Sequence, residues 1–215
     1  MKPSLNSSQS GFTIIESLVA IIVVAILLAG VAPLLVFSTA TRVQSRRVEL
    51  ASQAASSYIS GMQSGAIKLH PPEGIEAQLK DEPAPIIGNL ADCTTANYYC
   101  QAAPTGPNNT ATTQLFCIDN DGGGCTEDST SDMIIQAYRQ PNSDTGDGYP
   151  IGVRVYRADA FANGALVIGR QQSTVTSGLG DRNAPVVEMT AEIPGANGQT
   201  NFGALCDRLG GCGRP

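Results

Sequence analysis

The chain contains no tryptophan and a single histidine, and only 5% of its residues are aromatic. Few side chains are therefore available for acid–base catalysis, since His70 stands beside two prolines and is predicted to be a solvent-exposed loop residue. No serine lies in a G-x-S-x-G turn, and Gly122–Gly124 is not followed by the Lys and Ser or Thr of a phosphate-binding loop. These absences predict that the protein is not an enzyme.

Charge is absent from residues 17–41 and is unevenly distributed elsewhere. Residues 1–68 carry five basic and two acidic side chains, a net charge of +3, whereas residues 69–215 carry 8 basic and 17 acidic ones, a net charge of −9. An acidic domain repels phosphate backbones, so no nucleic-acid partner is expected.

Cysteine is absent from the first 92 residues, and no C-x-x-C pair occurs anywhere. The even number of cysteines predicts disulfides and an oxidising compartment, with free structural thiols and a metal site as the less favoured alternatives. Sequence alone does not choose among the pairings, although sequential pairing is the simplest because each bond closes a short loop. The six candidates are Cys93, Cys100, Cys117, Cys125, Cys206 and Cys212.

The uncharged residues 17–41 are dominated by Ile, Val, Leu and Ala. A helix of this length spans roughly 37 Å at about 1.5 Å per residue, enough to cross a hydrocarbon core of about 30 Å. The acid Glu16 stands at the start of this run. Placing a carboxylate at the bilayer centre costs about 2.5–3.5 kcal/mol, so the presence of Glu16 at the start of this helix needs a physical explanation.

Cleavage between Gly11 and Phe12 supplies that reason. The new α-amine of Phe12 would be cationic near neutral pH, with a reference pKa of about 7.7–8. Glu16 lies four residues further on, on the same helix face and at the helix N-terminus, where negative charge is favoured. It can neutralise its own amine or that of a neighbouring helix in an assembly. The alternative, a signal-anchor helix with a chance Glu, leaves this residue order unexplained.

The cleavage segment resembles the prepilin peptidase site of type IV pilins and type II secretion pseudopilins. The resemblance implies that Gly11 precedes the cut, that Phe12 becomes the N-methylated first residue, and that Glu16 acts in subunit docking. Pro33 falls where many pilins have a helix-bending proline. The implied partners are a prepilin peptidase, other pilin subunits, an inner-membrane assembly platform and, before assembly, membrane lipid. The resemblance is carried by Gly11-Phe12-Thr13-Ile14-Ile15-Glu16-Ser17-Leu18-Val19-Ala20.

A second segment, residues 40–51 with Ala54, Ala55, Tyr58 and Ile59, resembles the cyanobacterial hormogonium polysaccharide secretion pseudopilins. This resemblance implies a minor subunit that supports polysaccharide export and gliding motility. The alternatives are a minor subunit of a retractile pilus for twitching or adhesion, a type II secretion pseudopilin, and a membrane-anchored binding module that never polymerises.

The charges that flank the apolar run argue against an extracytoplasmic location for the C-terminal part of the chain. Arg42, Arg46 and Arg47 follow the run, whereas only Lys2 and the amino terminus precede it. The positive-inside rule alone would place the arginines in the cytoplasm. The leader motif and the cysteines favour a single-pass inner-membrane protein with an extracytoplasmic head, which later enters a periplasmic or cell-surface filament. The arginines would then pair with acids such as Glu49 on adjacent subunits.

The predicted fold class is α+β, with a long N-terminal helix packed on an antiparallel β-sheet. An apolar stripe that includes Leu50, Ala54, Tyr58 and Met62 predicts the helix face that meets the sheet. The continuing helix is expected to reach Ile67, with Gly65 and then Pro71-Pro72 as its breakers. The predicted divisions are a leader at 1–11, a transmembrane half-helix at 12–38, an amphipathic half-helix at 39–68 and a β-rich head at 69–215.

Residues 70–112 are predicted to form a long loop region, followed by strands. Alternation of apolar and polar residues, as in Val153-Arg154-Val155-Tyr156-Arg157, predicts a half-exposed antiparallel sheet. The predicted strands are Gln114–Ile118, Met133–Arg139, Ile151–Arg157, Ala165–Ile168 and Val186–Ile193.

The one candidate cofactor is calcium, on an acidic, glycine-rich segment that contains Asp119, Asp121, Glu127 and Asp128. Close-spaced carboxylates supply the oxygen ligands that calcium prefers. The segment fails the EF-hand spacing, because Gly123 falls where a third ligand should stand. The favoured alternative is a solvated acidic hairpin loop closed by a Cys117–Cys125 disulfide.

Overall fold

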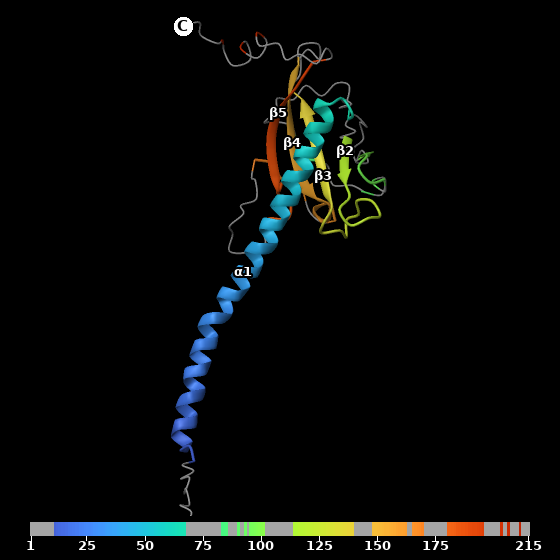
Figure 1. Ribbon diagram of the computed structural model, residues 1–215. Helices are drawn as coiled ribbons and strands as arrows, with labels where there is room; N and C mark the ends of the chain where they lie inside the picture. The colour runs from blue at the N-terminus through green and yellow to red at the C-terminus, as the bar shows by residue number, and fades with distance from the viewer. Residues whose placement is uncertain are drawn as a thin grey trace, which may run out of the picture.

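The computed structural model describes residues 11–67, 83–85, 90, 93, 95–101, 114–139, 148–162, 165–169, 180–195, 203, 206 and 211. The C-terminal half of a long helix lies across a β-sheet, while its N-terminal half extends away from the sheet (Figure 1). The predicted α+β fold, a long helix on an antiparallel sheet with disulfides, is confirmed. The predictions for residues 1–10, His70, Pro71, Pro72 and Cys212 lie outside the described residues.

Helix α1 (Ile14–Gln63) contains 50 residues and continues through Pro33 without a break. It curves along its length (Figure 1), and the predicted local bend at Pro33 stays a prediction. The helix ends before the predicted Ile67. Gly65 has a φ of 75°, a left-handed conformation that glycine adopts without steric cost, and its N–H donates to the carbonyl of Met62 at 3.1 Å. The predicted continuation of the helix from Ser64 to Ile67 is therefore wrong, while residue 68 lies outside the described residues.

The described strands form one antiparallel sheet in which each strand pairs with the next along the chain. This meander order places residues such as Ile135 and Val155 directly opposite each other. The strands are β1 (Tyr99–Gln101), β2 (Gln114–Ile118), β3 (Met133–Arg139), β4 (Tyr149–Arg157) and β5 (Val187–Ile193).

Two strand predictions are wrong. Residues 165–168 form no strand, although the N–H of Val167 donates to the carbonyl of Asn183 at 3.0 Å. Strand β1 lies inside the region predicted to be loop. A three-residue strand carries too short a pattern to be recognised, and β1 is defined by its distant pairing with β2. The bounds of β2 and β3 are confirmed, while β4 begins two residues earlier than predicted and β5 one residue later.

The main core lies between α1 and the sheet, and it confirms the predicted helix stripe. Ala51, Ala54 and Ala55 let the helix approach the sheet closely, while Tyr58 and Met62 fill the remaining space. The Tyr58 hydroxyl lies 2.8 Å from that of Tyr99, and the Tyr58 ring packs edge-on against a sheet phenylalanine. Burial raises the pKa of the Tyr58 hydroxyl, so this group stays neutral. The sheet side chains in this core include Phe116, Met133, Ile135, Ile151, Val153, Val155, Val187 and Ile193.

The opposite face of β2, β3 and β4 is also covered, so the predicted half-exposed sheet is wrong for these strands, whereas Thr190 of β5 is exposed. A second core joins Leu115, Ile134 and Tyr156 to disulfide cysteines and to Phe161 beyond the 3-10 helix η2 (Ala158–Ala160). Arg154, predicted to be solvent-facing, is 1% exposed. Its charge is accommodated because Nε donates to the Glu188 carboxylate at 2.9 Å and the guanidinium lies 4.5 Å from the centre of the Tyr138 ring.

Disulfides close two of the three loops expected from sequential pairing. Cys93 bonds Cys100, and Cys117 of β2 bonds Cys125 in the middle of the loop that joins β2 to β3. Cys206 is also disulfide-bonded. No free thiol occurs among the described cysteines.

Candidate assembly interface

The start of α1 combines an exposed peptide bond with an acid in the first helical turn. Gly11, Phe12 and Thr13 precede the helix, and the Phe12 side chain is 82% exposed. Thr13 is the N-cap, and its Oγ1 accepts a hydrogen bond from the backbone N–H of Glu16 at 3.3 Å. Glu16 therefore stands where the unpaired N–H groups of a helix favour negative charge. The spacing Thr13-x-x-Glu16 is a known signal for the start of a helix. Thr13 can therefore be recognised as the N-cap from the sequence.

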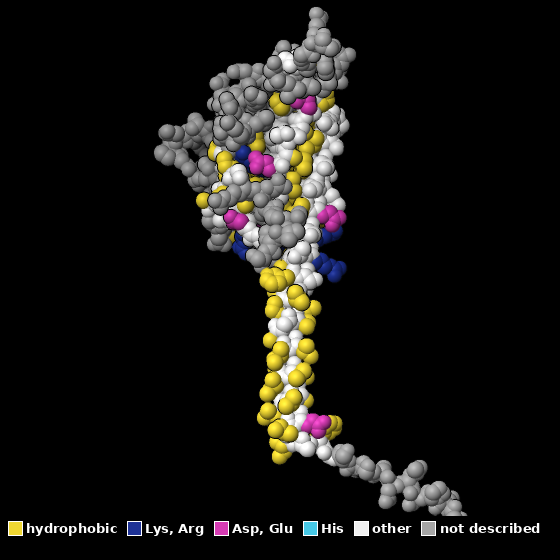
Figure 2. Space-filling model, turned by 90° about the vertical axis from the view of Figure 1, so that its left-hand side faces the viewer, with side chains coloured by type: hydrophobic (Ala, Val, Ile, Leu, Met, Phe, Trp, Pro, Cys, Tyr) yellow, Lys and Arg dark blue, Asp and Glu magenta, His cyan; other side chains and the backbone are white. Residues whose placement is uncertain are grey.

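The first half of α1 carries large apolar side chains that the head leaves uncovered (Figure 2). Ile14 is 90% exposed, and even Phe37, near the head, is 49% exposed. The helix is long and apolar enough to cross a membrane by length and composition. Burying one apolar side chain of this size is more favourable than leaving it in water by about 1.5–3 kcal/mol. A surface with so many of them is therefore expected to be covered by lipid or by other apolar helices.

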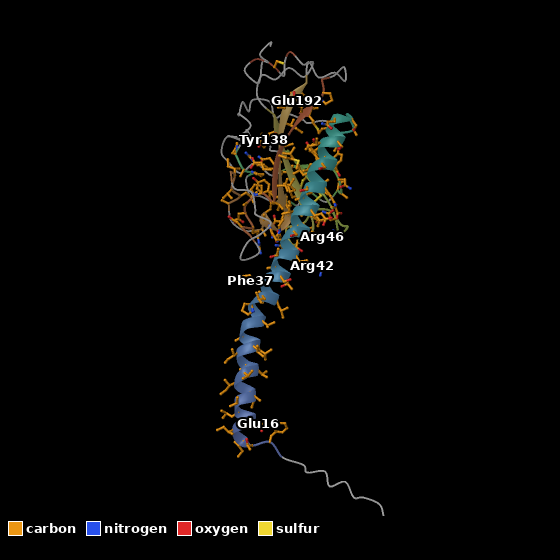
Figure 3. All side chains as sticks on the ribbon, turned by 60° about the vertical axis from the view of Figure 1, so that its left-hand side comes forward. Glu16, Phe37, Arg42, Arg46, Tyr138 and Glu192 are labelled. Carbon is orange, nitrogen blue, oxygen red and sulfur yellow. A yellow bond between two sulfur atoms is a disulfide. The ribbon has the colours of Figure 1, made fainter. Side chains whose placement is uncertain are left out.

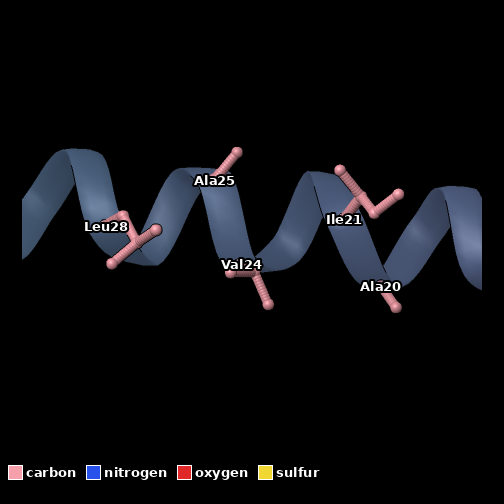
Figure 4. Close-up of a pocket in the computed structure, with 5 residues that line it drawn as sticks. All are labelled: Ala20, Ile21, Val24, Ala25 and Leu28. Carbon is pink, nitrogen blue, oxygen red and sulfur yellow. The ribbon is translucent and has the colours of Figure 1, made fainter.

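A shallow apolar hollow lies on the exposed part of α1 (Figure 4). Its lining includes two small side chains, Ala20 and Ala25, which point to opposite edges of the helix in the view of Figure 4. Small residues allow close approach of a second helix in an apolar environment. The hollow is lined by Ala20, Ile21, Val24, Ala25 and Leu28.

The cationic side chains begin where the apolar surface ends (Figure 3). Arg42 and Arg46 are exposed, and Arg46 Nη1 lies 3.2 Å from Glu49 Oε2, three residues further along the helix. The predicted pairing of these arginines with Glu49 on adjacent subunits stays a prediction. Within the chain itself, Glu49 already has Arg46 as its partner. An exposed pair of this kind contributes only about 0–1 kcal/mol.

A buried polar cluster lies where α1 meets the base of the head. Arg157 Nη2 donates to Asp159 Oδ2, and Arg182 Nε approaches the same oxygen at 3.8 Å. Burial, reinforced by the neighbouring Arg157, lowers the pKa of Arg47, while the Asp159 carboxylate acts in the opposite direction. Sequence analysis missed this cluster because its members come from α1, the end of β4, the 3-10 helix η2 and the segment before β5, and no local pattern links them.

The acidic loop between β2 and β3 brings together a different set of carboxylates from the predicted one. Oxygens of Asp119, Asp121 and Asp132 lie within 4.8 Å of one another. Asp119 accepts hydrogen bonds from the backbone N–H groups of Gly122 at 2.6 Å and Gly124 at 2.8 Å. These bonds, with that of Gly124 the largest cause, lower the pKa of the Asp119 carboxyl.

Glu127 and Asp128 do not belong to this carboxylate cluster. Glu127 Oε1 instead accepts from the backbone N–H of Leu90 at 3.4 Å, and Asp128 is exposed. Of the predicted ligands, the cluster therefore contains Asp119 and Asp121, and calcium binding by this loop stays a prediction. Sequence analysis also missed Asp132, since it lies at the far end of the loop and only the hairpin pairing brings it back to Asp119.

The apolar helix, its acid and the residues before it coincide with a known sequence family. Residues 6–32 match the prokaryotic N-terminal methylation motif. The matched segment contains Gly11, Phe12 and Glu16, and it runs into the exposed surface of α1. No curated protein and no solved structure matches the chain.

The methylation motif supports a type IV pilin-like or pseudopilin-like protein. It implies processing by a prepilin peptidase and assembly with other pilins, and the apolar helix that contains most of it suggests membrane anchoring. The individual roles of Gly11 and Phe12 in cleavage, of Phe12 in methylation and of Glu16 in docking stay predictions.

Proposed function

We propose that the chain is a filament subunit, either of a type IV pilus-like fibre or of a type II secretion-like pseudopilus, and that it acts by assembly rather than catalysis. The observation that carries the proposal is the methylation motif at residues 6–32 on a helix whose apolar side chains the head leaves exposed. In the membrane, lipid covers this surface. In a filament, the helices of neighbouring subunits replace the lipid.

Hydrolysis of the Gly11–Phe12 peptide bond prepares the helix for this exchange. The bond lies outside α1, where a peptidase reaches it without unwinding helix. The released amine is cationic, and Glu16 is its natural partner on an adjacent subunit. Two unit charges about 4 Å apart attract by about 4 kcal/mol at an effective dielectric constant of about 20. That attraction is comparable with the cost of about 2.5–3.5 kcal/mol for holding Glu16 in the bilayer.

The apolar contacts between subunits then depend on the shape of the exposed helix. The hollow around Ala20 and Ala25 accepts a side chain of an adjacent helix, which permits close packing where no water is present to drive association. Glu16 would set the register of this packing, since an unpaired carboxylate among apolar helices is costly.

The proposed location of the head is extracytoplasmic, with α1 in the inner membrane before assembly. The Cys93–Cys100 and Cys117–Cys125 disulfides support an oxidising compartment. The positive-inside rule opposes this orientation through Arg42, Arg46 and Arg47. Two of these charges have acids beside them, since Arg46 pairs with Glu49 and Arg47 lies near Asp159, which weakens the objection.

A narrower proposal is a minor subunit that serves polysaccharide export and gliding motility. It rests on the resemblance of residues 40–59 to the cyanobacterial hormogonium polysaccharide secretion pseudopilins. A retractile pilus for twitching or adhesion is the alternative within the filament class. Deleting the gene and measuring exported polysaccharide and surface motility separately distinguishes the two, because loss of twitching with normal export would favour the retractile pilus.

The filament proposal is tested by replacing Glu16 in the full chain. Glu16→Gln keeps the side-chain size but removes the charge, and we expect the variant to be cleaved and inserted normally yet to be depleted from sheared filaments. Asp128→Asn is the control, because it removes an exposed acid of the head that lies outside the methylation motif. Equal recovery of Glu16→Gln and the parent in filaments would refute electrostatic docking.

Mass spectrometry of the mature N-terminus separates a filament subunit from a membrane-anchored binding module that never polymerises. We expect the chain to begin with N-methylated Phe12. If the membrane-bound protein instead still began at Met1, that result would support the static anchor.

A further inference from the structure

The carboxylate cluster at the β2–β3 loop contains a buried acid whose charge is not balanced. Asp132 is 0% exposed, and its Oδ1 accepts a hydrogen bond from the backbone N–H of Asn120 at 2.9 Å. Its Oδ2 is buried and has no hydrogen-bond partner among the described residues. A buried ionised carboxylate is strongly destabilising unless it is paired or coordinates a metal.

The two neighbouring acids add to this imbalance. Asp119 is half-buried and Asp121 is exposed, and the three residues place carboxylate oxygens within 4.8 Å of one another. Residues 119–132 contain neither Lys nor Arg. Three like charges at this separation repel one another, so a cation between them would relieve the repulsion and complete the coordination of Asp132.

The geometry and the donor atoms define the class of cation. All three donors are carboxylate oxygens, which suit hard cations rather than zinc or copper. Calcium binds oxygens at about 2.3–2.6 Å, so two ligands on opposite sides of one ion are about 4.6–5.2 Å apart. The observed limit of 4.8 Å fits within that span. Calcium also accepts irregular coordination and water ligands, whereas magnesium demands a nearly ideal octahedron.

We propose that Asp119, Asp121 and Asp132 bind a calcium ion that joins the two ends of the β2–β3 loop. Asp119 follows β2 directly and Asp132 precedes β3 directly, so a shared ion would hold the strand ends together. The Cys117–Cys125 disulfide closes part of the same loop but leaves residues 126–132 outside its ring. The ion therefore adds a constraint that the disulfide does not supply. Unlike the filament proposal, this inference does not depend on α1.

Calcium titration of the full chain in detergent, after removal of bound ions with a chelator, tests the site directly. We expect saturable binding by isothermal titration calorimetry and a rise in Tm on adding calcium chloride. Asp132→Asn should weaken calcium binding by roughly tenfold or more, because affinity depends on the number of charged ligands. Asp121→Asn tests the same site at an exposed position, and its amide oxygen can still accept the 2.8 Å hydrogen bond from the Ser129 hydroxyl.

Asp128→Asn is the matched control, since it removes an exposed acid of the same loop that lies outside the cluster. This variant should bind calcium like the parent. Without calcium, Asp132→Asn should melt at or above the parent Tm, because it removes an unbalanced buried charge. The proposal would be overturned by absent calcium binding in the parent, by undiminished affinity in both Asp132→Asn and Asp121→Asn, or by loss of binding in Asp128→Asn.

Discussion

Gly152 of β4 lies against Tyr138 of β3. Whether Gly152→Ala stabilises or destabilises the fold is therefore expected to depend on the Tyr138 ring. These residues lie opposite each other in the sheet, and a Cβ on Gly152 would lie 2.3 Å from two carbons of the Tyr138 ring. The ring is held in place by Arg154 and by a 3.3 Å hydrogen bond from its hydroxyl to Glu188. Alanine at position 152 must therefore displace a fixed ring.

The magnitude follows from two opposing effects. Overpacking a filled site costs about 1–3 kcal/mol. Because Gly152 does not have a positive φ, alanine fits its backbone and would otherwise stabilise the fold by about 0.4–1 kcal/mol. We expect Gly152→Ala to destabilise the protein by about 1–2 kcal/mol. At about 2–4 °C per kcal/mol, Tm should fall by roughly 2–8 °C.

A double-mutant cycle isolates the cause of this effect. In a Tyr138→Ala background the clash is absent, and Gly152→Ala should become stabilising by about 0.4–1 kcal/mol. Tyr138→Phe is the control, because it keeps the ring and loses only the hydroxyl. Gly152→Ala should remain destabilising there. Thermal melts of the full chain in detergent, followed by near-ultraviolet circular dichroism, measure the parent and the five variants. The same Gly152→Ala effect in all three backgrounds would refute the reasoning.

Three further effects test the packing, the cross-links and the acidic loop. Tyr58→Phe should cost about 0.5–1.5 kcal/mol by urea denaturation through loss of the 2.8 Å contact with Tyr99, whereas Tyr98→Phe, at an exposed ring, should change nothing. Replacing both Cys117 and Cys125 with Ser should lower the free energy of unfolding by about 2.5 kcal/mol, the chain-entropy value for a loop of this length. Because its folded pKa is lowered, the Asp119 carboxylate stabilises the fold above its unfolded pKa of about 4, and this stabilisation is lost as pH falls through the folded pKa. Asp119→Asn should therefore lower Tm more at neutral pH than in acid, and an equal effect at both would contradict the hydrogen-bond explanation.

The helix and most strands are predictable from sequence because their signals are local. The stripe through Ala54, Tyr58 and Met62 repeats at helical spacing, and strands β2 and β3 are short apolar runs bounded by polar segments. The exposed motif at Gly11–Glu16 is equally local, which is why it is found without any structure. Its function in assembly depends on molecules outside the chain and stays a proposal.

The failed predictions concern interactions between distant residues. Arg154 has the pattern of a solvent-facing strand residue, but Glu188 and Tyr138 surround it from the neighbouring strands. Asp132 does not stand out in sequence, since its burial and its closeness to Asp119 arise from pairing of β2 with β3. Burial of a polar residue is decided by what packs over it, and alternation along one strand does not contain that information.

The two halves of α1 show how one helix is adapted to two environments. Against the sheet it presents small residues, Ala51, Ala54 and Ala55, because the partner surface is close and fixed. Between Ile14 and Phe37 it presents branched side chains on every side, which suits lipid and offers no single face to one rigid partner. The hollow at Ala20 and Ala25 is a local exception. An acid lies at one end of this apolar half and arginines at the other, so in the proposed filament charge, more than the shape of the apolar surface, would limit its position along a neighbouring helix.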